Sequence, residues 1–337
     1  MDKELQTLIQ RLKDNVLGCE DKCVNLGMLK FEARDGAMRL FSELTSYYFK
    51  TDAKNPRDPK VVHAAKQFCG LMNVPHPFFA KNPDHMKNQI VSTWLPALTP
   101  EKAIILAKIR KGKGDSCLLR AVLPVEFANI PNADIMSMVA EVVGDNFRVE
   151  FIIGDAQDDL LLHVRFVSNE IFDVCGESCS VGFSVIVSEL GAAPISVETL
   201  LFRNGSKASM IATYGGEPFF ESNYEGIQPS TLRELFPRLM LQLTDQLSTL
   251  KDRIYAAKGK VTKEEDIQAL MKKLRLRKGL NEKFHTLLFQ EIKSNPVQNR
   301  WEFVNRMAIL AKDFPSELRV RIEKAAGELL DLVFEKS

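Results

Sequence analysis

Two pairs of cysteines have a spacing at which a metal ion could be held. Three residues separate Cys19 from Cys23, and three separate Cys175 from Cys179. Structural zinc sites space each pair by two to four residues, and Cys19 and Cys23 on a helix would lie one turn apart. No feature of the sequence brings the two pairs together, and small free thiols are common in protein interiors. The sequence therefore favours free thiols and no cofactor, and a four-cysteine metal site is the alternative.

The chain carries no complete catalytic motif. The segment CGESCSVG, from Cys175 to Gly182, lacks the final glycine of the G-x-S-x-G nucleophile elbow. The segment RKGKGDS, from Arg110 to Ser116, lacks the G-x-x-x-x-G-K-[ST] order of a phosphate loop. No nucleophile, base and oxyanion donor can be named together, so we expect the protein not to be an enzyme.

Three clusters of basic residues are candidates for contacts with nucleic acid, because Lys and Arg neutralise backbone phosphates. The clusters are Lys108, Arg110, Lys111 and Lys113; Arg203 and Lys207; and Lys272, Lys273, Arg275 and Arg277. The first two are expected at hairpin or loop tips, where nearby Phe202 and Tyr214 could stack on bases. The alternatives are solvated turns for the tips and ordinary dipole chemistry for the third cluster, which ends a helix.

The composition is that of a globular protein without a general affinity for polyanions. The chain has 337 residues, 45% hydrophobic and 26% charged, with a formal net charge of +1. Any nucleic-acid contact must therefore be local. No apolar run reaches the roughly 18 residues of a membrane span, and the N-terminal segment is a charged amphipathic helix. We expect a cytoplasmic protein with no membrane partner.

Hydrophobic periodicity predicts an α+β fold with a central antiparallel sheet of hairpins between two helical regions. The predicted parts are a helical N-terminal region at 1–100, a β-rich core with one helix at 101–228, and a helical C-terminal region at 229–337. A helix is predicted from Ala33 to Phe49, and another from Asn132 to Val143. The last two parts are expected to pack as one unit.

Two hairpins are predicted in the core. Phe147–Ile153 and Leu160–Phe166 alternate apolar and polar residues, which is typical of half-buried antiparallel strands. Asn204-Gly205 suits a two-residue type I′ turn, which would place Arg203 opposite Ser206.

Several short motifs resemble the phage- and plasmid-encoded family called domain of unknown function 932. The motifs are Ser188-Glu189; Arg203-Asn204-Gly205; the spaced residues Trp301, Asn305 and Ala311; and Ala326-Gly327. The segment from Cys69 to Leu95 resembles the helical segment that precedes them in that family. The chain departs from the pattern at Pro124, Glu126 and Phe127, where the family tends to have a basic and aromatic run. The resemblance implies a phage or plasmid setting in a bacterial host cell.

Basic hairpin tips on a curled antiparallel sheet, with helices that could pack between subunits, favour a protein that binds single-stranded DNA and acts as a self-associated, annealing-like oligomer. This prediction is an analogy of architecture. The alternative is a non-enzymatic factor that binds another protein, as a host inhibitor or an assembly factor. The near-zero net charge favours that alternative.

Overall fold

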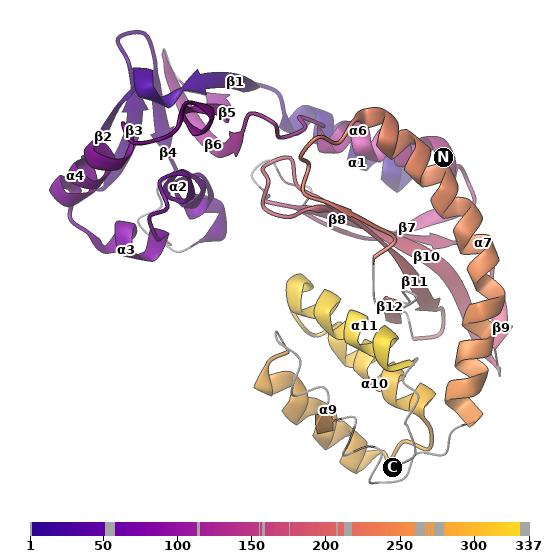
Figure 1. The fold of residues 1–337 in the computed structure, drawn as a ribbon. Helices are drawn as coiled ribbons and strands as arrows, with labels where there is room; N and C mark the ends of the chain where they lie inside the picture. The colour runs from indigo at the N-terminus through magenta and orange to yellow at the C-terminus, as the bar shows by residue number, and fades with distance from the viewer. Residues whose placement is uncertain are drawn as a thin grey trace.

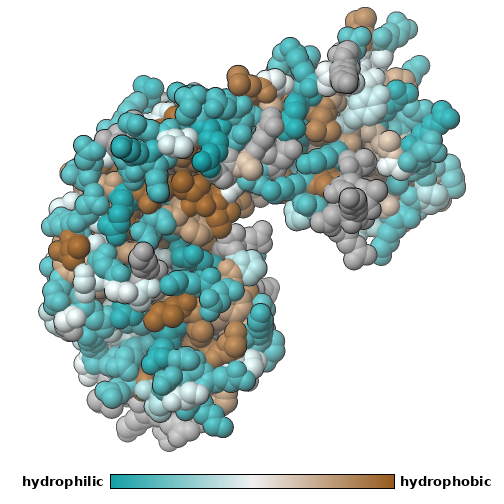
Figure 2. Space-filling model, turned by 180° about the vertical axis from the view of Figure 1, so that it is seen from behind, coloured by the Kyte–Doolittle hydropathy of each residue, from teal (hydrophilic) through white to brown (hydrophobic). Residues whose placement is uncertain are grey.

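The computed structural model describes residues 2–50, 58–112, 115–154, 156, 159–174, 176–206, 208–211, 218–259, 267, 269, 271–272 and 280–330. Its fold class is α+β, as the sequence predicts, with two sheets and helices toward both ends of the chain. The two sheets lie in separate lobes, and together with the C-terminal helices they form a crescent (Figure 1). The space-filling view shows the open notch on the inner side of the crescent (Figure 2).

The first lobe holds a six-stranded mixed sheet in the order β1-β5-β6-β4-β3-β2, in which β4 and β6 are parallel. The N-terminal helix α1 (Lys3–Asn15) precedes this lobe in the chain but packs in the apolar core of the second lobe. The elements of the first lobe are β1 (Cys19–Asn25), a 3-10 turn (Leu26–Met28), β2 (Lys30–Arg34), β3 (Ala37–Phe41), β4 (Ser46–Phe49), α2 (Pro59–Leu71), α3 (His76–Lys81), α4 (Asp84–Trp94), α5 (Pro100–Ala103), β5 (Ile104–Lys111) and β6 (Ser116–Pro124). This sheet combines strands from both sides of residue 100.

The predicted helix from Ala33 to Phe49 is wrong, because this segment forms the end of β2 and the strands β3 and β4. Asp35 and Gly36 both have positive φ, at 51° and 79°, which is the backbone of a tight hairpin turn. The Asp-Gly pair was the local signal for this hairpin. The apolar residues of the segment fit a period of two as well as a helical period, and pairing with β6 decides between them.

The second lobe holds a seven-stranded antiparallel sheet. Its main order is β12-β11-β10-β8-β7, with β13 on β11 and β9 on β10. Its elements are α6 (Asn132–Val143), β7 (Phe147–Ile153), β8 (Leu162–Ser168), β9 (Phe172–Val174), β10 (Glu177–Val187), β11 (Ile195–Arg203), β12 (Ala208–Ile211) and β13 (Phe220–Ser222). The C-terminal helices are α7 (Pro229–Gly259), α9 (Glu282–Ser294), α10 (Arg300–Ala311) and α11 (Ser316–Leu330).

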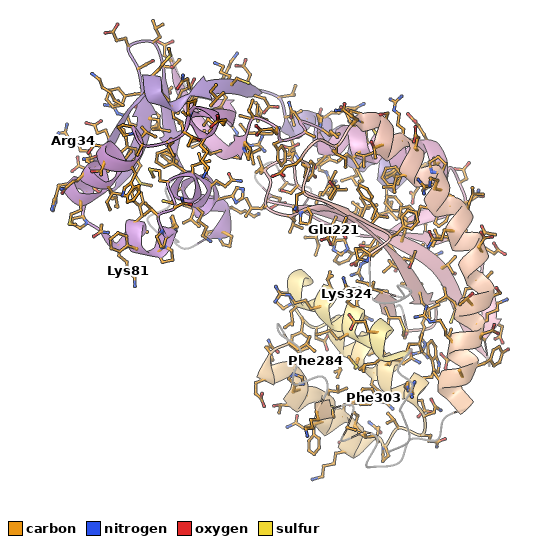
Figure 3. The ribbon with its side chains drawn as sticks, viewed as in Figure 1. Arg34, Lys81, Glu221, Phe284, Phe303 and Lys324 are labelled. Carbon is orange, nitrogen blue, oxygen red and sulfur yellow. The ribbon has the colours of Figure 1, made fainter. Side chains whose placement is uncertain are left out.

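Helices cover both faces of the seven-stranded sheet. On the first face, Val164 and Val185 pack with α1, α6 and the first half of α7 in one apolar core. A second core joins α9, α10 and α11 to the end of the sheet, and Phe284 and Phe303 lie within it (Figure 3). The second face meets α11, since Lys324 of this helix reaches Glu198 of β11. Apolar packing therefore fixes α11 against a sheet face that is itself rich in polar side chains.

The register of the β11–β12 hairpin differs from the predicted one. Arg203 pairs with Ala208 and Phe202 with Ser209, so the connection has four residues, not two. This register makes the predicted two-residue turn at Asn204-Gly205 wrong. The pairing of this segment with β10 continues through Asn204, whose N–H donates to the Ser178 carbonyl at 3.0 Å, and the chain reverses only after it. That bond ties the tip to β10.

Candidate nucleic-acid interface

The second face of the seven-stranded sheet carries buried polar side chains from β8. His163 and Arg165 point to this face, while the alternating Val164 packs in the apolar core on the other face. Every residue of β8 is buried. The prediction of a half-buried strand is therefore wrong for β8, because α11 covers the face that the alternation assigns to solvent.

Arg165 and Glu323 join this face to α11 by a bidentate ion pair. Arg165 Nη1 donates to Glu323 Oε1 at 2.9 Å, and Arg165 Nη2 donates to Glu323 Oε2. Ser209 Oγ accepts from Arg165 Nη1 at 2.8 Å, and Arg319 Nε donates to Glu323 Oε1 at 2.9 Å. The side chains of Arg165 and Glu323 are 2% and 0% exposed. Such a pair tolerates burial because the hydrogen bonds satisfy both charged groups.

His163 is held neutral beside this pair. Its Nε2 lies 2.7 Å from Ser184 Oγ and accepts from Arg165 Nε at 3.3 Å. Burial, followed by the charges of Arg165 and Arg319, places the pKa of His163 well below its usual value. The Ser184–His163 distance is that of a nucleophile and its base, but both side chains are buried. The pair therefore bonds the sheet internally and does not offer a base to solvent.

A cavity of about 220 Å³ opens next to the Arg165–Glu323 pair. We call it the cation–aromatic pocket, and it is lined by Glu150, Phe151, Arg165, Val167, Leu200, Phe202, Ser209, Lys312 and Arg319. Strands β7, β8, β11 and β12 supply its floor, and the α10–α11 corner supplies Lys312 and Arg319. The pocket therefore exists only where the sheet and the C-terminal helices meet.

Cations contact both aromatic rings of the pocket. The guanidinium carbons of Arg165 and Arg319 lie 5.0 Å and 4.7 Å from the centroid of the Phe151 ring. The guanidinium carbon of Arg148 lies 5.6 Å from the centroid of Phe202. These distances are within the range of cation–π attraction, so the rings and the positive charges form one unit.

Positive charge exceeds negative charge at the pocket. Arg165, Lys312 and Arg319 line it, against Glu150 on the wall and Glu323 behind it. Lys312 Nζ donates to the Ser206 carbonyl at 3.1 Å, a neutral acceptor. Arg319 uses Nε for Glu323 and, within the described residues, has no partner for its two terminal nitrogens. The pocket can therefore accept an anionic group.

The first predicted basic cluster does not form a single free surface. Lys108 is buried, and its ammonium lies 3.1 Å from the Asp21 carboxylate. Lys111 pairs with Glu20, and this hydrogen bond raises the pKa of Lys111. Arg110 is half-buried opposite Cys19 on β1. Lys113 lies outside the described residues.

In the second cluster, Arg203 is paired. Arg203 Nη2 lies 2.7 Å from Glu177 Oε2, and the Arg203 guanidinium carbon lies 5.8 Å from the centroid of Trp301. Glu177 Oε1 also accepts from Trp301 Nε1 at 2.9 Å. Arg203 thus connects the hairpin to α10. Lys207 and Tyr214 lie outside the described residues, whereas Phe202 lines the cation–aromatic pocket.

Of the third cluster, Lys272 is described and exposed. The other three members, Lys273, Arg275 and Arg277, lie outside the described residues. The helix-dipole interpretation of this cluster stays a prediction.

The cysteine spacing does not place a metal site on β1. Cys19 and Cys23 lie on one strand, not on a helix, so four strand steps of about 3.3 Å separate them. One zinc ion, with bonds to sulfur of about 2.3 Å, cannot reach both. Cys179 is buried in the other sheet, and burial raises the pKa of its thiol to about 11. Cys175 lies outside the described residues, and the described ones contain no cluster of three or more metal-binding side chains.

The motifs of the family resemblance come together in part. Arg203 and Trp301 meet at Glu177, although 124 positions separate Glu177 from Trp301. Glu189 pairs with Arg120 at 3.3 Å, and Asn305 is buried on α10. These contacts make Arg203, Trp301 and Glu189 structural links between the seven-stranded sheet and neighbouring elements.

Sequence reasoning missed most of the pocket. Lys312 directly follows the helix α10, Arg319 lies in α11, and Arg165 lies in an alternating strand, so none of the three stands out in its local sequence. The available signal was in β8, where His163 and Arg165 occur two positions apart in a strand rich in apolar residues. Only the placement of α11 shows that these side chains are covered.

Across the described helices, none is both long enough and apolar enough for a membrane crossing. Comparison with family models, curated proteins and solved structures found no match to this chain. The resemblance to domain of unknown function 932 therefore stays a prediction carried by its short motifs.

Proposed function

We propose that the protein binds single-stranded DNA and that one nucleotide unit of the strand enters the cation–aromatic pocket. The observation that carries this proposal is the placement of Phe151 and Phe202 in one cavity with Arg165, Lys312 and Arg319. Proteins that bind single strands combine aromatic stacking with positive charge along the backbone. The pocket offers both within one cavity.

Lys312 and Arg319 are the phosphate ligands in this proposal. Arg319 keeps its terminal nitrogens for an incoming anion, because its Nε alone contacts Glu323. Lys312 gives up only a bond to the Ser206 carbonyl. Arg165 is fully engaged with Glu323, Ser209 and His163. Its role is to hold positive charge under the Phe151 ring, not to contact phosphate.

The size of the pocket favours a single strand over a duplex. Its volume of about 220 Å³ is below the roughly 300–1,000 Å³ of pockets that hold a whole drug-sized ligand. A cavity of this size suits one base or one sugar-phosphate unit. Bases in a duplex are stacked and paired, so they cannot enter a recess without being extruded.

Among the described residues, the basic side chains at the predicted hairpin tips are weaker candidates for phosphate contacts than those of the pocket. Asp21 or Glu20 neutralises Lys108 and Lys111, and Glu177 neutralises Arg203. We therefore propose the pocket, and not the tips, as the main contact. An annealing-like role, carried out by a self-associated form, remains part of the proposal and rests on the analogy of architecture. The family resemblance supports only its phage or plasmid setting.

A salt-titrated anisotropy measurement tests the proposal. A fluorescent oligothymidine is titrated with the protein between about 50 and 200 mM salt, with a duplex of the same length as comparison. We expect binding to the single strand that weakens steeply with salt, and weaker binding to the duplex. No binding near about 100 mM salt would contradict the proposal. In that case, a host protein that co-purifies at fixed stoichiometry would favour the interaction-factor alternative.

A further inference from the structure

The outer strands of the two sheets are protected to different degrees. An outer strand exposes a row of unpaired backbone N–H and C=O groups, which can pair with another chain. The strand orders place β1 and β2 at the ends of the six-stranded sheet, and β7 and β12 at the ends of the main order of the seven-stranded sheet. Three of these four strands have a visible protecting contact.

Side chains or helices cover β2, β7 and β12. On β2, the Ala33 N–H donates to Asn88 Oδ1 at 2.7 Å, and Asn88 Nδ2 donates to the Ala33 carbonyl at 3.1 Å. On β7, the Val149 N–H donates to Asp2 Oδ2 at 2.8 Å. Helices α10 and α11 pack against β12. The side-chain contacts on β2 and β7 occupy backbone groups that a foreign strand would need, and two helices lie against β12.

Strand β1 has no such cover along its centre. The Lys111 N–H donates to the Gly18 carbonyl at 2.9 Å. From this bond and the register of the two strands, the backbone groups of Glu20 and Lys22 are those that point toward β5. In an antiparallel ladder, alternate residues bond to the neighbouring strand and the others point away. The backbone groups of Asp21 and Cys23 therefore point away from β5. Within the described part of the chain, no side chain or helix caps them.

We propose that β1 pairs with β1 of a second copy of this chain, antiparallel and with the two-fold axis at Asp21. The segment Cys19–Cys23 reads Cys-Glu-Asp-Lys-Cys, so it is complementary to itself when reversed. Glu20 then lies opposite Lys22 of the second copy, and Cys19 lies opposite Cys23 of the second copy. A two-fold interface requires this kind of self-complementarity.

The backbone groups fit this register. Asp21 exchanges its N–H and C=O bonds with Asp21 of the second copy, and each Cys23 N–H donates to the Cys19 carbonyl of the other copy. The Cys19 N–H takes no part, because it donates to the Val16 carbonyl at 2.9 Å within its own chain. The register therefore uses the outward-facing groups of the strand.

The charges and the apolar surface around β1 also favour a second copy of the chain as the partner of this strand. Within one chain, Lys22 Nζ lies 3.6 Å from Glu20 Oε2, with the two side chains 39% and 36% exposed, and Glu20 also pairs with Lys111. In the dimer, each of these exposed side chains also meets the opposite charge of the second copy. The two Asp21 side chains meet at the axis, and the Lys108 ammonium at 3.1 Å neutralises each of them. Leu17 and Met28, at 72% and 78% exposed, flank the strand and offer apolar area for the second copy to cover.

A charge reversal tests the pairing by analytical ultracentrifugation over the micromolar range. In Lys22→Glu, a glutamate faces Glu20 of the other copy at both symmetric positions, so we expect the dimer dissociation constant to rise about tenfold. The double variant Glu20→Lys/Lys22→Glu restores opposite charges and should recover the dimer. Lys30→Glu on β2 is the matched control. A monomeric wild type, or a dimer that Lys22→Glu leaves unchanged, would overturn the proposal.

The cysteines test the register independently. Directly paired residues of this ladder have Cα atoms about 5.5 Å apart, which is within the range of a disulfide. In a Cys175→Ser background, diamide should oxidise Cys19 and Cys23 of the second copy to a disulfide, taking up two electrons and two protons. The variants Cys19→Ser and Cys23→Ser should each fail to cross-link alone and should cross-link when mixed. Equal cross-linking of either variant alone would rule out this register. The inference is independent of DNA binding, so failure of one proposal leaves the other standing.

Discussion

Arg165 on β8 and Glu323 on α11 form a buried bidentate ion pair across 158 positions of the chain. This pair fixes the last described helix to the second face of the seven-stranded sheet. It also places Arg319 and Lys312 beside Phe151 and so completes the cation–aromatic pocket. The stability of the C-terminal region and the proposed binding site thus depend on the same contact.

Loss of the Glu323 carboxylate should destabilise the protein strongly. In Glu323→Ala, Arg165 keeps its charge in a buried place without its counter-ion, which costs about 3–5 kcal/mol of unfolding free energy. Urea unfolding followed by tryptophan fluorescence measures this, since Trp301 is buried in the adjoining core. The double variant Arg165→Met/Glu323→Leu should recover most of the loss, because the fully buried guanidinium is removed with the carboxylate. Only Arg319, whose side chain is 16% exposed, then loses a carboxylate partner. A loss below about 1 kcal/mol in Glu323→Ala would contradict this role.

Mild acid should weaken the fold through His163. Burial holds the pKa of His163 well below its unfolded value of about 6.5. The unfolded chain therefore binds a proton first as pH falls, and stability declines below about pH 6.5. His163→Gln should flatten the part of this decline that His163 causes, while burial of His63 and His76 leaves a remainder.

Urea unfolding at several pH values between about 5 and 8 measures the slope. His85→Gln changes an exposed helical histidine and is the matched control. Identical slopes in the wild type and in His163→Gln would show that His163 contributes nothing.

The Phe151→Leu variant should distinguish the contribution of aromatic stacking to DNA affinity from the contribution of positive charge. Leucine keeps an apolar side chain at the pocket wall but removes the ring on which a base would stack, at a cost of about 1–3 kcal/mol. We expect oligothymidine affinity to fall about tenfold at every salt concentration, with the salt slope unchanged because no cation is lost. An unchanged affinity would exclude stacking on Phe151.

Arg203→Ala should leave DNA binding almost unchanged. Glu177 and Trp301 already engage the Arg203 guanidinium, so this side chain holds the hairpin to α10. We expect lower thermal stability and an unaltered salt slope in the anisotropy assay. A slope reduced by about 0.7, the value for one lost phosphate contact, would show that Arg203 at the hairpin tip does contact the DNA backbone.

Local sequence patterns predict some elements of this fold. They fail where contacts with distant segments determine the secondary structure or the burial of a residue. The helix Asn132–Val143 is predicted at its observed bounds, since its apolar period and the following Gly144 both mark it. The segment Ala33–Phe49 fits both periods, and its strand character depends on β6, which follows far along the chain. The cation–aromatic pocket depends on which helix covers β8. The residues near Arg165 in the sequence do not indicate that it pairs with Glu323.

The most direct test of the proposed function is the salt dependence of oligothymidine binding in Lys312→Ala. Lys312 lines the pocket, and its only described hydrogen bond goes to a loop carbonyl, so its loss should leave the fold intact. The account predicts weaker binding and a slope of log K against log salt that is shallower by about 0.7. Lys30→Ala, which removes an exposed lysine from β2, should match the wild type. A Lys312→Ala slope equal to that of the wild type would contradict binding of single-stranded DNA at this pocket.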